Sequence, residues 1–314
     1  MKGEAMNFLQ IMRPLHWTKN VFVFAALVFG KKLIAPTDEV FSAVGGAMGG
    51  FFCFSLAASA IYIFNDIIDR ESDKLHPEKS QRPIAAGAVT VGSAAILSVL
   101  CAVAAIVCSY LLVNRLAIVI LIYIGLMVLY SLLLKRMMIL DCVAISIGFC
   151  LRAIAGVVVL KDPEVFISPW LIICTFALCL FLAFSKRRSE IALLRENSES
   201  FRKTLVGYTP ELLAHMLDVT SGLAIVCFLL YAMDERTLDT FDTNNLVYTT
   251  PIVLYCVFRF SALIQKGKYS NPVQLILRDR PFQIGSLLWV LACIGIIYAD
   301  KFFISINVGD VWPY

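Results

Sequence analysis

Long apolar runs separated by short polar segments occupy most of this 314-residue chain. Each run approaches the 17–25 residues that an α-helix needs to cross a bilayer. Composition agrees, because 60% of the residues are hydrophobic, 16% are charged and the mean hydropathy is +0.81, which is too apolar for a soluble domain. We therefore expect an all-α integral membrane protein with about nine transmembrane helices. Their expected ranges are 14–33, 39–65, 90–112, 116–134, 139–160, 167–185, 210–232, 246–265 and 281–299.

The distribution of basic residues predicts the orientation of these helices. With the N-terminus in the cytoplasm, 19 of the 27 Lys and Arg residues fall in cytoplasmic segments and six in external ones. Cytoplasmic loops of membrane proteins carry such an excess. We therefore expect a multi-pass protein of the inner or plasma membrane whose polar loops and active site face the cytoplasm. The cytoplasmic set is Lys2, Arg13, Lys19, Arg70, Lys74, Lys79, Arg82, Lys135, Arg136, Lys186, Arg187, Arg188, Arg195, Arg202, Lys203, Lys266, Lys268, Arg278 and Arg280.

An acidic motif follows the second apolar run directly, from Asn65 to Asp73. At about 100° per residue, Asp66, Asp69 and Asp73 share one face of a helix. Two carboxylates about 5 Å apart repel by about 3 kcal/mol at an effective dielectric of about 20. Oxygen ligands select a hard divalent cation, and Mg²⁺ that also binds a substrate phosphate is the usual solution. The alternative interpretation is a solvated acidic helix end.

Two charges lie inside the fifth apolar run. Arg152 is expected near the bilayer centre, where a cation costs about 2.5–3.5 kcal/mol even on the insertion scale. Asp141 precedes it by eleven residues, so both point along one face, about 16 Å apart. Either they line a common polar cavity or each pairs with another helix. For Arg259 and Asp218, in later runs, a structural or snorkelling charge is the favoured interpretation.

The ten cysteines and three histidines show no metal-ligand spacing. The cysteines are scattered through apolar runs without a CxxC pair, which is typical of small residues in helix packing. The histidines are far apart in the sequence. We therefore expect neither a disulfide framework nor a histidine metal site.

Two motifs resemble those of the UbiA-type polyprenyltransferase superfamily of membrane enzymes. Its members carry an Asp-rich motif after the second helix, here Asn65 to Asp73, and a Tyr…Lys element after the fourth, here Tyr130 and Lys135. Members that use a prenyl diphosphate carry a second Asp-rich motif after the sixth helix. This chain has the basic segment Ser185-Lys186-Arg187-Arg188-Ser189-Glu190 there, which indicates that an anion binds side chains directly.

The basic segment is similar to that of one branch, the polyprenyl-phosphate phosphoribosyltransferases. Four further stretches resemble this branch: Arg13 to Asn20, Asn65 to Gly87, Leu151 to Gly156 and Leu277 to Arg280. The resemblance implies transfer of 5-phosphoribose from phosphoribosyl diphosphate to a polyprenyl phosphate lipid such as decaprenyl phosphate. The product would be a lipid-linked pentose donor for cell-wall or surface glycan synthesis. The implied cofactor is Mg²⁺; no nucleic acid is implied as a partner, and a homo-oligomer is left open.

The resemblance also implies roles for particular residues within a single domain, 1–314, with a cytoplasmic Asp-rich loop at 66–88 and a basic loop at 186–209. Asp66, Asp69 and Asp73 would be catalytic and, with Asn65, would hold the metal. Lys186 and Arg187 would contact the 5-phosphate of the sugar donor. The other residues expected to contact substrate are Lys19, Asn20, Arg82, Tyr130, Lys135, Arg152 and Glu190.

Two other classes of function stay open from the sequence. An aromatic prenyltransferase of the same superfamily would use a prenyl diphosphate donor, but the second Asp-rich motif is missing. A non-enzymatic transporter or assembly factor explains Arg152, but not the co-occurrence of the Asp-rich motif, the Tyr130–Lys135 element and the basic segment. An assay with both donor classes separates the three.

Overall fold

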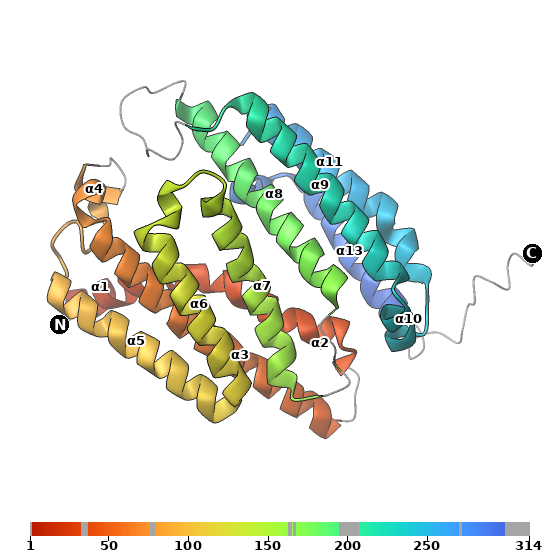
Figure 1. The fold of residues 1–314 in the computed structure, drawn as a ribbon, viewed down its shortest axis with the longest axis horizontal. Helices are drawn as coiled ribbons and strands as arrows, with labels where there is room; N and C mark the ends of the chain where they lie inside the picture. Colours follow the sequence, from red (N-terminus) through yellow and green to blue (C-terminus); the bar gives the residue numbers. More distant parts are fainter. Residues whose placement is uncertain are drawn as a thin grey trace, which may run out of the picture. The chain divides into compact units, whose positions relative to one another are not determined.

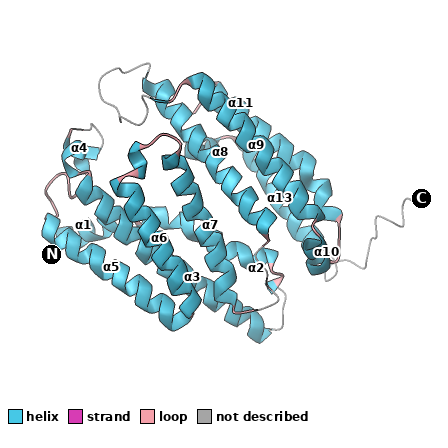
Figure 2. Ribbon diagram, viewed as in Figure 1, coloured by secondary structure: helices cyan, strands magenta, loops and turns pink. Residues whose placement is uncertain are grey.

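The computed structural model describes residues 2–32, 37–75, 79–162, 165, 168–194, 207–269 and 272–298. Within these ranges the regular secondary structure is entirely helical (Figures 1 and 2). Eight of the described helices are long and apolar enough to cross a membrane, which confirms the all-α membrane class. The chain divides into two compact units by its internal contacts, and the single domain expected from the sequence stays a prediction. The N-terminal unit is Met1–Ile167 with Glu199–Gly207, and the C-terminal unit is Ser168–Ser198 with Tyr208–Tyr314.

The N-terminal unit is built around one long helix, α3 (Thr37–Ile68), which packs against helices on several sides. Its neighbours α5, α6 and α7 run alongside it (Figure 1). The other elements of this unit are α1 (Lys2–Met12), η1 (Pro14–Phe24), α2 (Ala25–Phe29), α4 (Arg70–Lys74), η3 (Lys79–Gln81), α5 (Val91–Leu112), α6 (Asn114–Leu132), η4 (Leu134–Arg136) and α7 (Leu140–Leu160).

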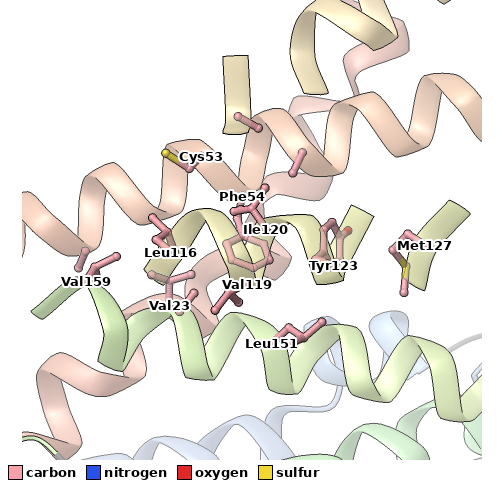
Figure 3. Packing of buried hydrophobic residues seen from close by; sticks show 14 of the residues in the cluster. Val23, Cys53, Phe54, Leu116, Val119, Ile120, Tyr123, Met127, Leu151 and Val159 are labelled. Atoms are coloured by element: carbon pink, nitrogen blue, oxygen red, sulfur yellow. The ribbon is translucent and has the colours of Figure 1, made fainter. Parts of the chain in front are cut away.

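Aromatic and branched side chains fill the space between α3, α6 and α7 (Figure 3). The rings of Phe54 on α3 and Tyr123 on α6 lie 5.2 Å apart, and Val23 of η1 belongs to the same cluster. The outer face of α5, by contrast, exposes large apolar side chains such as Val99 and Val103. An apolar outer face around a packed interior is what a lipid environment requires. The fold therefore positions a rigid interior against which polar side chains can be held.

The first expected span, 14–33, differs from the prediction. It forms the 3₁₀-helix η1 and the short helix α2, and neither is among the eight described candidate spans. A 3₁₀-helix rises about 2.0 Å per residue and rarely exceeds four residues, so a run of 11 residues needs a tertiary cause. That cause is the packing of η1 against α3.

Three residues of η1 at a spacing of three pack against α3 in antiparallel order. Trp17 Nε1 donates to Ser59 Oγ at 3.0 Å, and Asn20 Nδ2 donates to Ser55 Oγ at 3.0 Å. One turn further, Val23 is fully buried next to Gly50. Three residues of a 3₁₀-helix rise about 6 Å, as do four residues of an α-helix, so the two elements stay in register. We call the hydrogen-bonded contacts between η1 and α3 the polar seam.

The C-terminal unit pairs two long helices, α8 (Pro169–Leu194) and α9 (Pro210–Met233), with α11 packed against both. Helix α8 continues through Lys186 to Glu190, which places the first part of the segment expected as a loop at 186–209 in a helix. Residues 195–206, with Arg195, Arg202 and Lys203, lie outside the described residues. The remaining elements are α10 (Glu235–Phe241), η6 (Asn245–Thr249), α11 (Thr250–Gln265), α12 (Pro272–Arg278) and α13 (Arg280–Ile297).

Arg259 has the structural role that is favoured from the sequence. Its Nε and Nη2 atoms donate to Asp279 Oδ1 and Oδ2 at 2.6 and 3.0 Å. Asp279 also caps α13 by accepting from the backbone N–H of Phe282, and it accepts from the Tyr269 hydroxyl at 3.3 Å. These bonds hold the pKa of Asp279 down at about 2, mainly through Arg259. The residue ties α11 to the start of α13.

Candidate functional site

The acidic motif lies at the C-terminal end of α3, and a turn interrupts the helical face that the three aspartates are expected to share. Helix α3 ends at Ile68, Asp69 forms a turn, and α4 begins at Arg70. The backbone bonds Asp69 N to Asn65 O and Asp73 N to Asp69 O keep the helical direction across the turn. The three carboxylates are therefore close together but fall into two groups with different partners. We call Asn65, Asp66, Asp69 and Asp73 the Asp-rich cluster.

The first group consists of Asp66 and Asp73, which are both buried. Arg82 joins them, because its Nη1 atom lies 3.0 Å from Asp66 Oδ1 and 2.7 Å from Asp73 Oδ2. Arg13 holds Asp66 from the other side, with Nη2 at 2.5 and 2.7 Å from the two carboxylate oxygens. Two carboxylates thus share two guanidinium groups.

The second group consists of Asp69 and Asn65. Lys135, from η4, places its Nζ 2.6 Å from Asp69 Oδ1 and 3.2 Å from Asn65 Oδ1. Asn65 Nδ2 in turn donates to Asp69 Oδ2 at 2.9 Å. The Tyr130–Lys135 element therefore meets the Asp-rich cluster through its lysine, while Tyr130 is half-buried on α6.

A packed turn presents Arg82 to this cluster. The backbone bonds Ala86 N to Arg82 O and Val89 N to Pro83 O close the turn, and Gly87 supplies a positive φ of 77°. Ile84 and Val89 of the same turn are buried against α1 and α3. The position of Arg82 is therefore fixed by apolar packing as well as by its ion pairs.

Arg13 is a site residue that the sequence reasoning missed. It stands between α1 and η1 with φ 55° and ψ 60°, a left-handed conformation that is uncommon outside glycine. Its guanidinium also lies 5.4 Å from the ring centroid of Tyr62, one turn before Asp66 on α3. Its partner is 53 residues away in the sequence, so no local spacing reveals the pair. The signals available in the sequence are its cytoplasmic assignment, which places it at the same end as the Asp-rich cluster, and its place at the start of the stretch Arg13 to Asn20.

Arg152 occupies a different environment, at the inner end of the polar seam. Its side chain donates to Asn20 Oδ1 at 2.7 Å, to the Gly148 carbonyl at 2.7 Å and to the Tyr123 hydroxyl at 2.9 Å. Its guanidinium carbon also lies 4.7–5.6 Å from three aromatic ring centroids. We call these partners the Arg152 cage; the rings are those of Phe54, Tyr123 and Phe149.

The sequence leaves open whether Arg152 and Asp141 line a common polar cavity or have separate partners. In the structure the two side chains lie in separate local environments. Asp141 is fully buried in the first turn of α7, and the hydrogen-bond partners of Arg152 are Asn20, Tyr123 and Gly148 instead. Among the described residues, no carboxylate contacts Arg152. With only 5% of the residue exposed, its position favours a structural role over direct contact with a lipid phosphate.

The basic segment belongs to the C-terminal unit and has its own ion pairs. Arg187 is buried and donates to Glu190 Oε2 at 2.6 Å, whereas Lys186 is exposed, with Nζ 3.9 Å from Glu190 Oε1. Arg188 donates to the Pro210 carbonyl at 3.0 Å and so ties α8 to α9. Lys186 is thus the more accessible cation of the pair predicted to bind phosphate. In the N-terminal unit, Lys19 is exposed on η1.

The donor set of the Asp-rich cluster fits a magnesium ion chemically, because carboxylate and amide oxygens are the ligands that Mg²⁺ prefers. In this structure those oxygens contact Arg13, Arg82 and Lys135, and no group of three or more metal-binding side chains is preformed among the described residues. Glu71 is not part of the set. It is exposed and bonded to Lys74, which holds the pKa of Glu71 below its usual range.

An Asn-Asp-x-x-Asp motif stands at the end of the longest described helix, and a lysine from a later helix end contacts it there. In a helical membrane bundle, this combination defines a polyprenyltransferase-type membrane protein. The chain belongs to the UbiA prenyltransferase family, whose model matches residues 20–278. The resemblance inferred from the two motifs is thereby confirmed at the level of the family.

The chain is similar to curated relatives over most of its length. A decaprenyl-phosphate phosphoribosyltransferase of Mycolicibacterium smegmatis is 34% identical, over 92% of this chain and 92% of that protein. One of the same name from Mycobacterium tuberculosis is 32% identical, over 90% and 91%. Among solved structures, a UbiA homologue from Archaeoglobus fulgidus bound to DMAPP and Mg²⁺ matches with a TM-score of 0.69. That match covers 93% of this chain and 99% of that one at 17% identity, so it shows the fold alone.

Proposed function

We propose that this chain transfers 5-phosphoribose from 5-phosphoribosyl-1-diphosphate to a polyprenyl monophosphate and releases diphosphate. The observation that carries the proposal is the 34% identity, spread over nine-tenths of both chains, with an enzyme named for that reaction. The basic segment of α8 supports it, since a prenyl diphosphate enzyme would need a second acidic motif there. The product would be a lipid-linked pentose donor for cell-wall or surface glycans.

The reaction asks mainly for positioning and electrostatic stabilisation. The lipid phosphate is already an anionic nucleophile, so no strong general base is needed. As the bond from ribose C1 to the leaving diphosphate breaks, negative charge grows on the diphosphate and positive charge grows on the sugar. The chain must therefore neutralise the leaving group while holding two phosphate-bearing substrates together.

The Asp-rich cluster is the proposed place for the leaving diphosphate. Asp66, Asp69 and Asp73, with the amide oxygen of Asn65, would hold the metal, and Mg²⁺ when bound supplies charge neutralisation at the diphosphate oxygens. Arg82 and Lys135 already reach these carboxylates, so each can turn toward a phosphate without moving its backbone.

The 5-phosphate of the sugar donor is assigned to the basic segment. Lys186 is the better candidate for a direct contact, because its side chain is 59% exposed while that of Arg187 is 5% exposed and paired with Glu190. A lysine acts on phosphate as a flexible point charge, which suits an accessible position on a helix. The active site is proposed to face the cytoplasm, where the water-soluble donor is present.

The experiment is a transfer assay on purified protein in lipid nanodiscs with Mg²⁺. Phosphoribosyl diphosphate labelled in the ribose is supplied with or without polyprenyl phosphate, and in a parallel arm a labelled prenyl diphosphate is supplied with an aromatic acid. We expect label in an organic-extractable product only when polyprenyl phosphate is present. Prenylation of the aromatic acid with no ribose-lipid formed would overturn the proposal in favour of an aromatic prenyltransferase.

A further inference from the structure

Each side chain of the Asp-rich cluster has at least one oxygen held by a basic side chain of the protein. Both oxygens of Asp66 are held by Arg13, and one of them also by Arg82. Asp73 is held by Arg82, and Asp69 by Lys135. Three carboxylates thus face three cationic side chains, and the cluster is formally neutral.

The amide ligand is engaged in the same way. Asn65 Oδ1, the atom that a metal would coordinate, accepts from Lys135 Nζ at 3.2 Å. Arg82 is shared between Asp66 and Asp73 through a single nitrogen, Nη1, so displacing it from one carboxylate weakens its contact with the other. The ion pairs are charge-assisted and lie in partly buried surroundings, where they are stronger than in water.

A divalent cation that enters this cluster alone must displace these side chains. The cluster then carries a net charge of +2, because cations that have lost their partners remain beside the metal in a partly buried place, and such uncompensated charge is costly. If a diphosphate enters with the metal, its negative charges compensate the dication and accept the displaced guanidinium and ammonium groups. The same three side chains oppose the metal alone and favour the metal with a diphosphate.

We propose that Arg13, Arg82 and Lys135 act as internal counter-ions that make metal binding at the Asp-rich cluster conditional on a phosphate ligand. Metal and diphosphate then bind with positive coupling, and each binds weakly alone. Reciprocity requires that the metal tightens diphosphate binding by the same factor that diphosphate tightens metal binding. The inference deepens the proposed function and rests on it, because a diphosphate group is taken as the ligand.

The test measures binding of Mn²⁺, as a spectroscopic substitute for Mg²⁺, to the full-length protein in detergent by electron paramagnetic resonance. Titrations are run with and without inorganic diphosphate at matched free Mn²⁺, after subtraction of the complex that the two form in solution. In the wild-type protein we expect diphosphate to tighten Mn²⁺ binding by at least about tenfold, the value of one charge-assisted hydrogen bond. Coupling below about twofold overturns the proposal.

A matched pair of variants tests the residues. Arg82→Gln removes the cation shared by Asp66 and Asp73, so Mn²⁺ without diphosphate should bind about tenfold more tightly than to the wild type, and the coupling should shrink. Arg70→Gln removes the same charge next to the cluster, but Arg70 lies near Glu71 instead, at 3.7 Å. We expect Arg70→Gln to change the Mn²⁺ affinity by less than about twofold. An equal gain in both variants, or none in Arg82→Gln, overturns the proposal.

These measurements use neither ribose nor lipid, so they fail separately from the proposed function. Coupling without ribose-lipid formation removes the proposed reaction and leaves the counter-ion mechanism, while ribose-lipid formation without coupling does the reverse. If Arg82→Gln does not fold, Arg82→Lys keeps the charge with a single ammonium group that cannot bridge both carboxylates equally well. Without diphosphate, Arg82→Lys should bind Mn²⁺ more tightly than the wild type and Arg70→Gln, but by less than the tenfold expected for Arg82→Gln. An affinity equal to that of the wild type with full coupling assigns the coupling to charge alone and overturns the role of the shared guanidinium.

Discussion

Asp66 and Arg152 are both almost fully buried in the N-terminal unit, at 3% and 5% exposure, but their charges are balanced in different ways. Asp66 is balanced by two guanidinium groups that are themselves 21% and 28% exposed. Arg152 is balanced by neutral oxygens and aromatic faces that belong to the packed core. Partners at the edge of the unit can move to a ligand, whereas partners within the core cannot.

This difference predicts that the two places respond in opposite ways to substitution. At the Asp-rich cluster, function should be lost with little loss of stability. At the Arg152 cage, stability should be lost first. One segment of the chain connects the two, since Arg13 contacts the Asp-rich cluster and Trp17 and Asn20 of the polar seam follow it toward Arg152.

The largest effect is expected for Asp69→Asn. The change removes a proposed metal ligand, and loss of one electrostatic contact to a developing charge typically costs about a hundred- to a thousandfold in turnover. Stability should fall by less than about 1 kcal/mol, because Asp69 and its partner Lys135 are both partly exposed. Ribose-lipid formation and thermal unfolding of the purified variant measure the two quantities.

Glu71→Gln is the control for Asp69→Asn. It makes the same charge change two residues away, but Glu71 is 75% exposed and pairs with Lys74. Its turnover should stay within about twofold of the wild type, as expected for an exposed ion pair. If both variants lose turnover equally, the loss reflects the local charge and not a ligand at Asp69.

The second prediction concerns Arg152→Met, which keeps a long side chain but removes every donor. The oxygens of Asn20 and Tyr123 then lose this donor, at about 1–3 kcal/mol for each buried group left unsatisfied, whereas the Gly148 carbonyl keeps its backbone hydrogen bond inside α7. We expect a loss of about 3 kcal/mol or more in the free energy of unfolding, with poor rescue by Arg152→Lys, whose ammonium lacks the planar fork. Normal stability together with weaker use of the lipid acceptor would instead support the substrate contact expected for Arg152 from the sequence.

The sequence predicts the Asp-rich cluster and not the polar seam, and the reason is distance along the chain. Asn65 to Asp73 form a motif whose chemistry is local, so their proximity follows from helical spacing alone. Two of the hydrogen-bond partners of Arg152, Tyr123 and Asn20, come from 29 and 132 residues away, and only folding brings them together. The 3₁₀ form of η1 is also set by packing. Its residues Trp17, Asn20 and Val23 are spaced by three, and this spacing acquires its meaning only from their contacts with α3.

The sequence also does not reveal how deeply the individual site residues are buried. Asp66 and Asp73 are buried, since Arg13 and the packed turn carrying Arg82 cover them. Lys186 and Arg187 share a helix, so the sequence treats them alike, but their exposures differ by an order of magnitude. Burial of individual side chains depends on which face of α8 packs, and composition does not reveal this.

The third prediction addresses the fit between η1 and α7. A Cβ added at Gly156 would overlap the backbone carbonyl of Val23, so alanine there must push η1 away from its partners. Overpacking of this kind typically costs about 1–3 kcal/mol. Gly125→Ala is the control, because its added Cβ meets nothing within 4 Å. We expect Gly156→Ala to lower the temperature of thermal unfolding and Gly125→Ala to leave it unchanged. Equal unfolding temperatures for the two variants would mean that η1 is not tightly held.

The smallest effect is expected at Asp279, an acid that pairs with arginine as Asp66 does but has a structural role in the C-terminal unit. Its pKa is lowered from 3.8 to about 2, chiefly by the hydrogen bond from Arg259, so the folded state prefers the carboxylate. That preference contributes stability above pH about 4, and the contribution is lost as the pH falls toward about 2. The Arg259 side chain is 29% exposed, so solvent screens the pair and its contribution to stability is small.

Asp279→Asn tests this assignment, because asparagine keeps the cap of α13 and removes only the titrating charge. The melting temperature of the wild type should fall relative to that of Asp279→Asn as the pH is lowered from about 4 to about 2, and the difference between them should be constant above that range. Turnover of Asp279→Asn at neutral pH should stay near that of the wild type, since this arginine pair releases no partner to a ligand. A large loss of turnover with unchanged melting would place Asp279 with the acids of the Asp-rich cluster instead.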